Sequence, residues 1–280
     1  MSAFTISAVE AGRLLPGLTD VVARASALIV TMSGAAVPHR LKPDQSPVTA
    51  VDEASEAEIL RGLALLLPGV PVVAEEMSGR EAAPALDGIF LMVDPLDGTK
   101  EFIAGSDEFT VNVAILSGGA PVAGVVAAPK RGLLWRGATG IGAERLRLTP
   151  DGAADAQPIR TRRWPAKNAV GLTSRSHLDP ATQAFVDGLE PIARERYGSA
   201  LKFCLIAEGS ADVYPRLATT CEWDVAAGHA VVVAAGGAVT TPDGCAIPYG
   251  RAAENFRVPA FIAWGDPEKA GKVLTTPILR

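Results

Sequence analysis

The sequence predicts a packed α/β or α+β protein, and three observations support that class. The chain has 280 residues, of which 48% are hydrophobic, so it can bury a large core in one domain or in two closely joined layers. Aromatic residues make up only 5%, whereas Gly, Ala, Val and Leu are plentiful, which suits close helix–sheet contacts. Segments with helical periodicity also alternate with short apolar runs of strand length.

The first part of the chain is typical of two helices. Apolar residues recur at helical spacing over residues 6–33, where Pro16-Gly17 is expected to break or kink the helix and Gly34 to end it. A polar loop is expected over 35–47, and a second helix over about 52–67.

Short apolar runs follow, each typical of a buried strand. The runs 70–74 and 89–93 end directly before Glu75 and Asp94, so both strands would deliver a carboxylate at their C-terminal ends. Three further runs predict a β-hairpin that continues as antiparallel sheet: 109–116, 121–128 and 133–136.

Residues 149–167 are rich in Ala, Asp, Pro and Arg and show little periodicity. They are expected to connect an N-terminal α+β half, residues 1–148, to a C-terminal half, residues 168–280, within one compact unit. The C-terminal half is expected to hold strands over 169–173, 211–214 and 260–264, and helices over 181–189, 200–208 and 224–235.

The charge pattern argues against a nucleic-acid partner. The net charge is -5, and no segment carries a dense basic run. The basic residues that do cluster are expected on a solvated surface: Arg160, Arg162, Arg163 and Lys167. A nucleotide-sized substrate remains open, because it needs only two or three well-placed cations.

The chain is expected in the cytoplasm. Glu10 and Arg13 interrupt any early apolar run, so no signal peptide is expected. The longest apolar stretch, 225–239, is too short to span a bilayer, so no transmembrane segment is expected. The three cysteines show no metal-ligand spacing and are expected as reduced thiols: Cys204, Cys221 and Cys245.

The segment Asp94-Pro95-Leu96-Asp97-Gly98-Thr99 carries the most chemistry. Pro95 fixes its own φ and restricts Asp94 to extended geometry, so neither regular helix nor regular strand is expected there. Two carboxylates held close together are electrostatically costly unless a cation lies between them, and oxygen-only ligands favour Mg²⁺. From the residues alone an ordinary surface turn remains the favoured interpretation, since Asp, Pro and Gly all form turns.

Two more acids are candidate ligands. Glu75 follows a predicted strand, and Asp224 precedes a predicted apolar helix, where an N-cap role is the simpler interpretation. The N–H groups of Gly98 and Thr99 could meet a phosphate if they open a helical turn.

Taken together, Asp94–Thr99 and Glu222-Trp223-Asp224-Val225-Ala226-Ala227-Gly228 resemble the two signatures of the inositol monophosphatase-like, lithium-sensitive phosphatases. Glu75-Glu76 and the segment 46–52 (SPVTAVD) match two further motifs of that family. The resemblance covers about residues 45–235, in the family's order.

Four other segments are similar to the bacterial 3'(2'),5'-bisphosphate nucleotidases within that family. They are Lys100-Glu101-Phe102, Ser174-Arg175-Ser176-His177, 198–204 (GSALKFC) and 211–217 (ADVYPRL).

The resemblance implies a layered αβαβα fold with metals between its halves. It implies that two or three Mg²⁺ are bound by Glu75, Asp94, Asp97, Asp224 and the backbone carbonyl of Leu96. It also implies a hydrogen bond between Asp52 and Thr99, and this pair would orient or activate the attacking water.

The implied substrate is adenosine 3',5'-bisphosphate, with 3'-phosphoadenylyl sulfate as a second candidate. Loss of the 3'-phosphate would give AMP or adenylyl sulfate, which links the enzyme to sulfur assimilation. Ser199, Lys202 and Arg216 match positions that contact nucleotide phosphates in related nucleotidases, and Ser174 with His177 would lie near the nucleoside. The remaining substrate contacts implied by the resemblance lie at the metal turn and opposite it: Leu96, Asp97, Gly98, Thr99 and Asp224.

Two alternatives stay open at this stage. The first is a sister phosphatase that acts on inositol monophosphate or fructose 1,6-bisphosphate, because such enzymes share every metal ligand. The second is a catalytically silent phosphate-binding protein on the same fold. The chain is expected as a monomer or homodimer, either free in the cytoplasm or peripheral at the inner membrane.

Overall fold

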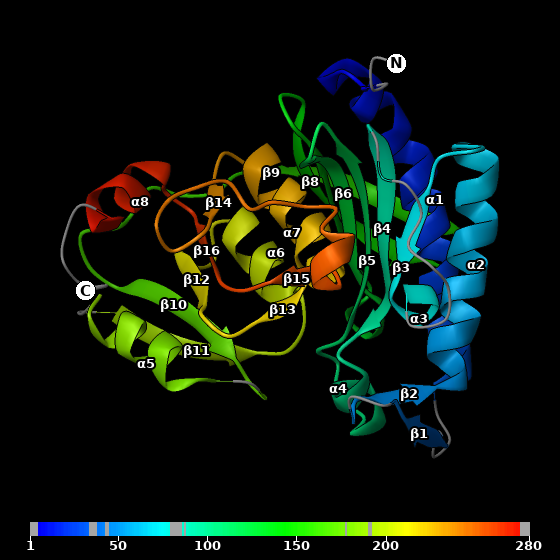
Figure 1. Ribbon diagram of the computed structural model, residues 1–280, viewed down its shortest axis with the longest axis horizontal. Coiled ribbons are helices and arrows are strands. Elements are labelled where there is room, and N and C mark those ends of the chain that lie inside the picture. Colours follow the sequence, from blue (N-terminus) through cyan, green and yellow to red (C-terminus); the bar gives the residue numbers. More distant parts are fainter. Residues whose placement is uncertain are drawn as a thin grey trace.

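The computed structural model describes residues 5–33, 38–42, 45–78, 86, 88–176, 178–189 and 192–274. Its secondary structure forms five layers in the order helices, sheet, helices, sheet, helices (Figure 1). This is the αβαβα arrangement that the sequence predicts.

The first sheet has seven strands in the order β3-β4-β5-β6-β7-β8-β9. Only the pair β3–β4 is parallel, and every later strand pairs antiparallel with the next one along the chain. Their bounds are β3 Val72–Ala74, β4 Ile89–Asp97, β5 Thr110–Ser117, β6 Ala120–Ala128, β7 Leu133–Ala138, β8 Gly142–Thr149 and β9 Gly152–Ile159. The two strands expected before Glu75 and Asp94 are therefore confirmed, as is the hairpin of β5 and β6.

Two long helices, α1 (Ala8–Met32) and α2 (Ala50–Leu66), cover the outer face of this sheet (Figure 1). The expected break at Pro16 is wrong, because α1 continues through that residue. Ser7 caps α1 and forms a capping box with Glu10. By length and composition α1 could also cross a membrane, but half of its most apolar window is buried inside the protein, as in a core helix.

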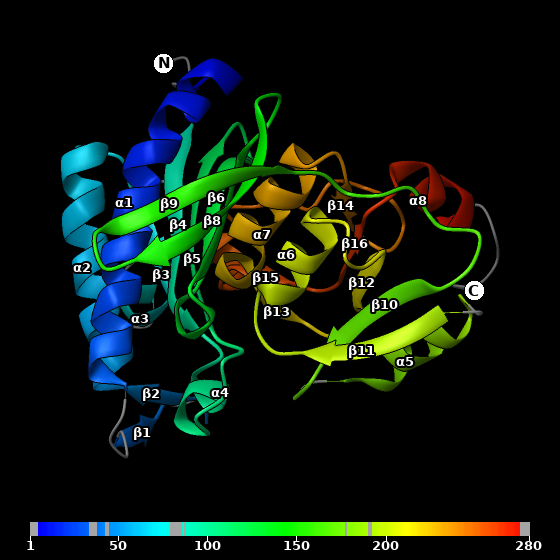
Figure 2. The ribbon, with the colours of Figure 1, turned by 180° about the vertical axis from the view of Figure 1, so that it is seen from behind.

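The middle layer consists of α6 (Leu201–Ala207) and α7 (Glu222–Ala234), packed between the two sheets (Figures 1 and 2). The two helices approach closely where Gly228 of α7 meets Phe203 of α6, since a Cβ built on Gly228 would lie 2.4 Å from the ring. The buried core on this side joins residues of both sheets through these helices.

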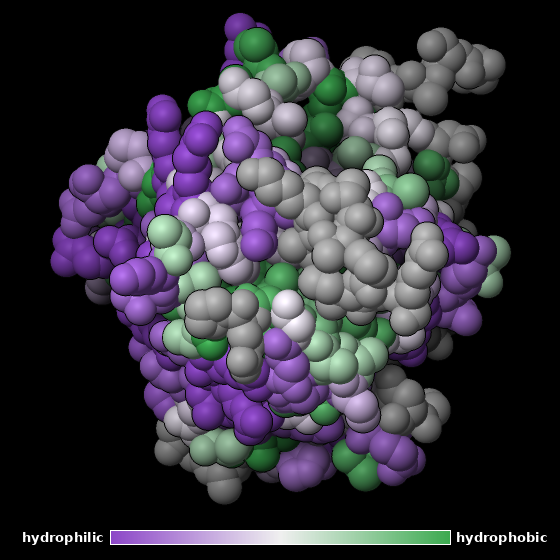
Figure 3. Space-filling model, turned by 90° about the vertical axis from the view of Figure 1, so that its left-hand side faces the viewer, coloured by the Kyte–Doolittle hydropathy of each residue, from purple (hydrophilic) through white to green (hydrophobic). Residues whose placement is uncertain are grey.

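The second sheet has five strands in the order β11-β10-β12-β16-β14. Their bounds are β10 Ala169–Ser174, β11 Ile192–Tyr197, β12 Val213–Arg216, β14 Ala238–Thr240 and β16 Phe261–Trp264. Helices α5 (Pro180–Asp187) and α8 (Pro267–Leu274) lie on its far side, and hydrophilic side chains predominate among those coloured on that face (Figures 2 and 3).

Two expectations about connections are wrong. The loop expected over 35–47 instead includes a small antiparallel pair, β1 (His39–Leu41) with β2 (Pro47–Thr49). The connecting segment expected over 149–167 contains β9, whose side chains are mostly exposed and so leave no apolar run to detect. The chain therefore crosses from one sheet to the other over 160–168 (Figure 2).

This crossing segment is held by a buried acid. Asp212 is 1% exposed and accepts hydrogen bonds from Arg162 Nε at 2.8 Å and Arg162 Nη2 at 2.7 Å. The same carboxylate accepts one from the Val170 N–H at 2.7 Å. Arg162 is therefore a structural ion-pair partner, and its expected place on a purely solvated surface is wrong.

Candidate active site

The segment Asp94–Thr99 lies at the end of β4, next to the middle layer. Strand β4 continues to Asp97, but not as the regular strand that the sequence argues against. Its pairing with β5 is nevertheless irregular, with a shift in register between Asp94 and Asp97. Gly98 then turns the chain with φ 93°, a left-handed conformation that favours glycine, and α4 (Thr99–Ile103) begins.

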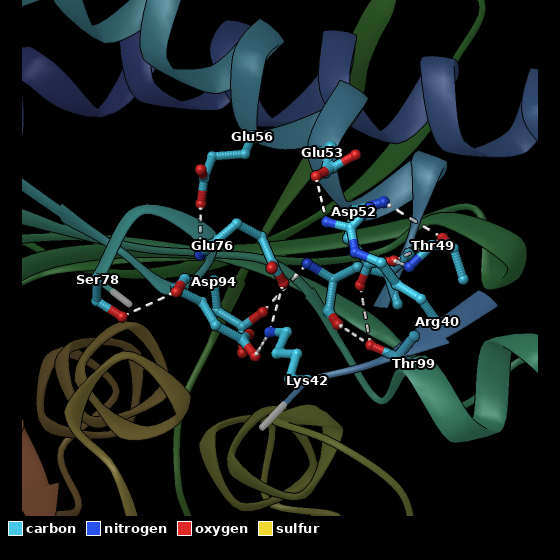
Figure 4. A network of polar contacts seen from close by, with 12 residues as sticks. Arg40, Lys42, Thr49, Asp52, Glu53, Glu56, Glu76, Ser78, Asp94 and Thr99 are labelled. Atoms are coloured by element: carbon cyan, nitrogen blue, oxygen red, sulfur yellow. Dashed lines mark hydrogen bonds and ion pairs between the residues drawn. The ribbon is translucent and has the colours of Figure 1, made fainter. Parts of the chain in front are cut away.

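The predicted hydrogen bond between Thr99 and Asp52 is present (Figure 4). Thr99 Oγ1 donates to Asp52 Oδ1 at 2.9 Å and lies 3.3 Å from the Leu96 carbonyl oxygen. Asp52 Oδ2 accepts from both the N–H and the hydroxyl of Thr49, at 2.8 and 2.6 Å. Asp52 is 1% exposed, so three donors hold this carboxylate in one orientation within the protein.

Four acids of the site repel one another, and the repulsion contributes to raised pKa values at three of them. Burial, followed by the negative charges of Glu75, Asp97 and Asp224, raises the pKa of Asp94 well above its usual range. Burial and the neighbouring charge of Asp224 raise the pKa of Asp97 to about 7. The pKa of Glu75 also rises to about 7, mainly through burial. Such shifts are typical of functional sites that concentrate like charges.

Asp224 reaches this cluster from α7. The helix begins two residues earlier than expected, so Asp224 stands at its third position and not at the N-cap. Its Oδ2 accepts hydrogen bonds from the Thr220 hydroxyl and, at 3.1 Å, from the Cys221 N–H. The N-cap interpretation of Asp224 is therefore wrong in position, although the carboxylate does satisfy one N–H at the helix start.

A lysine that the sequence did not single out lies against the acids. Lys42 Nζ, just beyond β1, is 2.7 Å from Glu75 Oε1 and 2.7 Å from Glu76 Oε1 (Figure 4). Glu76 is buried, and its N–H donates to Glu56 Oε2 at 2.9 Å. One cation thus already neutralises part of the acidic wall.

A second, cationic wall carries two cations from the second half of the chain, both close enough to Asp97 to oppose the rise of its pKa. Lys202 of α6 is only 2% exposed; its Nζ donates to the Ser199 carbonyl at 2.6 Å and lies 4.9 Å from the ring centre of Tyr214. Burial lowers the pKa of Lys202 to about 8, against the opposing effect of Asp97. Arg216 ends β12, and its buried Nε has no hydrogen-bond partner among the described residues.

A turn over 198–200 joins the two walls. The Ala200 N–H donates to Asp97 Oδ2 at 2.6 Å, and the Gly198 N–H donates to Glu108 Oε2 at 2.8 Å. Ser199 between them has φ 48°, which is strained for a residue with a side chain, and its buried hydroxyl has no partner among the described residues. Both contacts therefore fix a turn that would not form readily by itself.

A cavity of about 190 Å³ lies between the walls. Nine of the predicted site residues line it: Glu75, Asp97, Gly98, Thr99, Ser174, Ser199, Lys202, Arg216 and Asp224. Asp52, Asp94 and Leu96 are buried behind this lining. His177 lies outside the described residues.

Several lining residues were not predicted as site residues. They are Ser46, Pro47, Lys100, Glu101, Ala200, Phe203, Tyr214, Thr220, Val225 and Phe261. Most lie within matched motifs, so their positions, though not their roles, had a sequence signal. Trp223 is buried against Phe256, with ring centres 6.0 Å apart, and so belongs to the core.

The acids fit Mg²⁺ in donor type and charge. All four side chains offer oxygen, and the raised pKa of Asp94 reflects negative charges that need a cation. Among the described residues, no group of three or more His, Cys, Asp or Glu side chains is arranged so that these side chains alone could hold a metal ion. That is compatible with Mg²⁺, which usually keeps several waters and binds through few carboxylates together with substrate phosphates.

Comparison with known proteins gives a consistent result. The sequence profile of the inositol monophosphatase family matches residues 15–272. The 3'(2'),5'-bisphosphate nucleotidase CysQ of Escherichia coli K12 is 41% identical over 221 residues, which cover 79% of this chain and 86% of CysQ.

Two further similarities bear on fold and substrate. The crystal structure of CysQ from Bacteroides thetaiotaomicron superposes with a TM-score of 0.72 at 30% identity, covering 89% of this chain and 96% of that one. A histidinol-phosphatase of Mycobacterium tuberculosis is 34% identical over 226 residues, covering 76% of this chain and 80% of that enzyme.

Proposed function

Because the chain belongs to the inositol monophosphatase family, we propose that it hydrolyses the 3'-phosphate of adenosine 3',5'-bisphosphate to give AMP and phosphate. The similarity to CysQ supports this substrate class. We propose 3'-phosphoadenylyl sulfate as a second substrate, which would give adenylyl sulfate.

One observation carries the proposal: an acidic wall and a cationic wall face the same cavity. Glu75, Asp97 and Asp224 form the acidic wall, and the buried Lys202 and the partly buried Arg216 form the cationic wall. A substrate with two separated anionic groups can meet both walls, one phosphate at the metal site and the other at the cations. A neutral alcohol carrying one phosphate would leave the second wall without an anion, and unpaired buried polar groups weaken binding.

The proposed metal ligands are the side chains of Glu75, Asp94, Asp97 and Asp224 and the carbonyl of Leu96, and we propose that they hold two or three Mg²⁺. When bound, Mg²⁺ would lower the pKa of a water molecule and neutralise phosphoryl oxygens.

The chain's own groups would orient and deprotonate the attacking water. The Thr99 hydroxyl donates to Asp52, so its lone pairs face outward and can accept a proton from water. Asp52 would accept the proton at the end of this relay through Oδ1, the oxygen that faces Thr99. Its other oxygen, Oδ2, already accepts two hydrogen bonds from Thr49. The threonine is no base by itself, and the carboxylate supplies the driving force.

We place this reaction in the cytoplasm, where it would serve sulfur assimilation by removing a bisphosphate nucleotide. The small cavity and the net charge of -5 suit a small-molecule substrate and give no support to a nucleic-acid partner.

The decisive experiment compares phosphate release with Mg²⁺ from four compounds at matched concentrations. They are adenosine 3',5'-bisphosphate, inositol 1-phosphate, fructose 1,6-bisphosphate and histidinol phosphate, the last because of the similar mycobacterial enzyme. The bisphosphate nucleotide is expected to give the highest kcat/KM. A preference for any of the other three would overturn the substrate assignment while leaving a phosphatase.

A control separates catalysis from binding. If the purified protein bound the bisphosphate nucleotide but released no phosphate in Mg²⁺, it would be a silent phosphate-binding protein. Lys202→Met is the matched variant, expected to lose more activity on adenosine 3',5'-bisphosphate than on a monophosphate such as inositol 1-phosphate, because it removes a cation of the second wall.

A further inference from the structure

Two polar side chains are buried beside the acidic cluster without hydrogen-bond partners. Thr110 is 0% exposed and Asn112 is 1% exposed, both on β5. Neither the Thr110 hydroxyl nor either polar atom of the Asn112 amide has a partner among the described residues. Buried polar groups are usually paired, so a set of three unpaired atoms in one place calls for a physical explanation.

Their place in the sheet supplies one. Asn112 is directly opposite Asp94, and Thr110 is directly opposite Asp97, in the antiparallel pairing of β5 with β4. Directly opposed residues point to the same face of a sheet with Cβ atoms about 4.5–5.5 Å apart. Each unpaired side chain is therefore next to one acid of the candidate metal turn.

Apolar residues continue this face of β5. Ala114 and Leu116 alternate with Asn112 along the strand and pack in the core against the middle helices. On packing grounds a valine at 110 and a leucine at 112 would suit the same positions, because they bury similar volume without losing hydrogen bonds to water. Thr110 and Asn112 therefore lower the stability of the metal-free fold relative to apolar residues at the same positions.

Asp94 has few donors in this arrangement. One of its oxygens accepts from the Leu96 N–H at 3.1 Å, and its carboxyl also forms a hydrogen bond with the Glu75 carboxyl. When both carboxylates serve as metal ligands, neither can donate to the other, so Asp94 needs a new donor. Carboxylates that bind metals are themselves held by hydrogen bonds from neighbouring groups.

We propose that Asn112 and Thr110 are positioning residues for the metal turn: the Asn112 amide donates to Asp94, and the Thr110 hydroxyl donates to Asp97, once the acids hold a divalent cation. The inference rests on the proposed metal-dependent function. It explains why polar groups are retained in the core, since their hydrogen bonds to the two acids form only when a divalent cation is bound.

The test measures stability and Mg²⁺ binding without any substrate. Thr110→Val and Asn112→Leu are compared with the unaltered chain by thermal unfolding with and without Mg²⁺, and by calorimetric titration of Mg²⁺. The metal-free midpoint is expected to stay the same or rise, because unpaired buried groups are removed. The rise in midpoint caused by Mg²⁺ is expected to shrink, and Mg²⁺ affinity to fall by about 10–100-fold.

A positioning role predicts that the metal-free midpoint stays the same or rises while Mg²⁺ affinity falls, whereas a purely structural role predicts no loss of Mg²⁺ affinity. A matched control is Thr240→Val in β14 of the other sheet, whose buried hydroxyl also lacks a partner among the described residues. It should stabilise both forms equally and leave Mg²⁺ affinity unchanged. If the variants lower the metal-free midpoint and bind Mg²⁺ like the unaltered chain, the positioning role is wrong.

The same titration also tests the premise. Failure of the unaltered chain to bind Mg²⁺ would remove the proposed metal function and this inference with it. Normal binding by all variants would remove only this inference.

Discussion

Arg175 and Glu108 form an ion pair that joins the two halves of the protein. Arg175 follows β10 of the second sheet, and its Nε and Nη2 donate to the two carboxylate oxygens of Glu108 at 2.8 and 2.7 Å. Glu108 precedes β5 of the first sheet and also holds the Gly198 N–H. Glu108 therefore connects Arg175, at the end of β10, to the strained turn over 198–200, which contacts Asp97.

Glu108→Gln should weaken substrate binding more than turnover. The neutral amide cannot accept from Arg175 and Gly198 as a carboxylate does, so the turn over 198–200 should lose its fixed position. We expect KM for the bisphosphate nucleotide to rise about tenfold with a smaller change in kcat, measured by steady-state kinetics. Arg131→Gln is the control, because Arg131 lies 3.7 Å from the same carboxylate and makes its nearer contact with Asp107. Equal losses in both variants would contradict a special role for the Arg175 contact.

Asp94→Asn should abolish activity and leave the fold intact. The substitution keeps the size of a buried side chain but removes the negative charge that a metal needs. We expect phosphate release to fall at least about 100-fold, with unchanged circular dichroism, since even groups behind the ligands cost up to that much. Asp179→Asn, at the N-cap of α5, makes the same chemical change outside the site and should be nearly neutral. Near-normal turnover in Asp94→Asn would refute the metal role.

The metal-free protein should lose stability as pH rises. Folding raises the pKa values of Glu75 and Asp97 to about 7, so the folded chain keeps protons that the unfolded chain releases near its ordinary values of 4.5 and 3.8. The stability linked to these protons is present below the unfolded values and is lost as pH rises through about 7. Thermal midpoints measured from about pH 5 to about pH 8 should therefore fall without Mg²⁺.

Mg²⁺ should reverse that trend. Binding requires the ionised carboxylates, so the rise in midpoint caused by Mg²⁺ should be larger at about pH 8 than at about pH 6, and binding should release protons. The proton release can be read from calorimetry in buffers of different ionisation enthalpy. A Mg²⁺ effect independent of pH would count against the acids as ligands.

Lithium should inhibit the enzyme at millimolar concentration or below. This expectation rests on the resemblance of the Asp94–Thr99 and Glu222–Gly228 motifs to those of lithium-sensitive phosphatases. Initial rates in lithium chloride, with sodium chloride at the same ionic strength as the control, provide the measurement. An unchanged rate would set this chain apart from the lithium-sensitive members.

Gly228→Ala should destabilise the protein. The added methyl group would meet the Phe203 ring at 2.4 Å, and that ring is already stacked on Phe261 at 5.3 Å between centres. We expect a loss of about 1–3 kcal/mol in the free energy of unfolding, measured with denaturant. Gly12→Ala in α1 is the matched control, because its nearest neighbour is the half-exposed Ile141, which can move. The control should be neutral or stabilising by up to about 1 kcal/mol through helix propensity.

The sequence predicted the elements that have a strong local signal. Periodic apolar positions predicted α2, and short apolar runs predicted the buried strands β3 and β4. Glu75 and Asp94 could be predicted as site residues because each follows one of these apolar runs. The family motifs then predicted the Asp52–Thr99 hydrogen bond, which links residues 47 positions apart. No periodic pattern could have given that pair.

Other features depend on contacts that leave no local trace. Strand β9 is mostly exposed, so it resembles a linker, and Lys42 follows a short strand whose side chains are all exposed. The start of α7 was misplaced because its N-cap is Cys221, which is not a typical capping residue. Pairings such as Arg162 with Asp212 join residues 50 positions apart and become visible only in the folded chain.

The strand order of the first sheet has a consequence for how the protein folds. From β4 to β9 each strand pairs with its successor, so this sheet can form through short loop closures, which are fast. Lys202, Arg216 and Asp224 arrive only with the second sheet and its helices, more than a hundred positions after Asp94. A refolding chain should therefore regain most of its β-sheet signal before it regains affinity for Mg²⁺, and the delay between the two would time the docking of one half on the other.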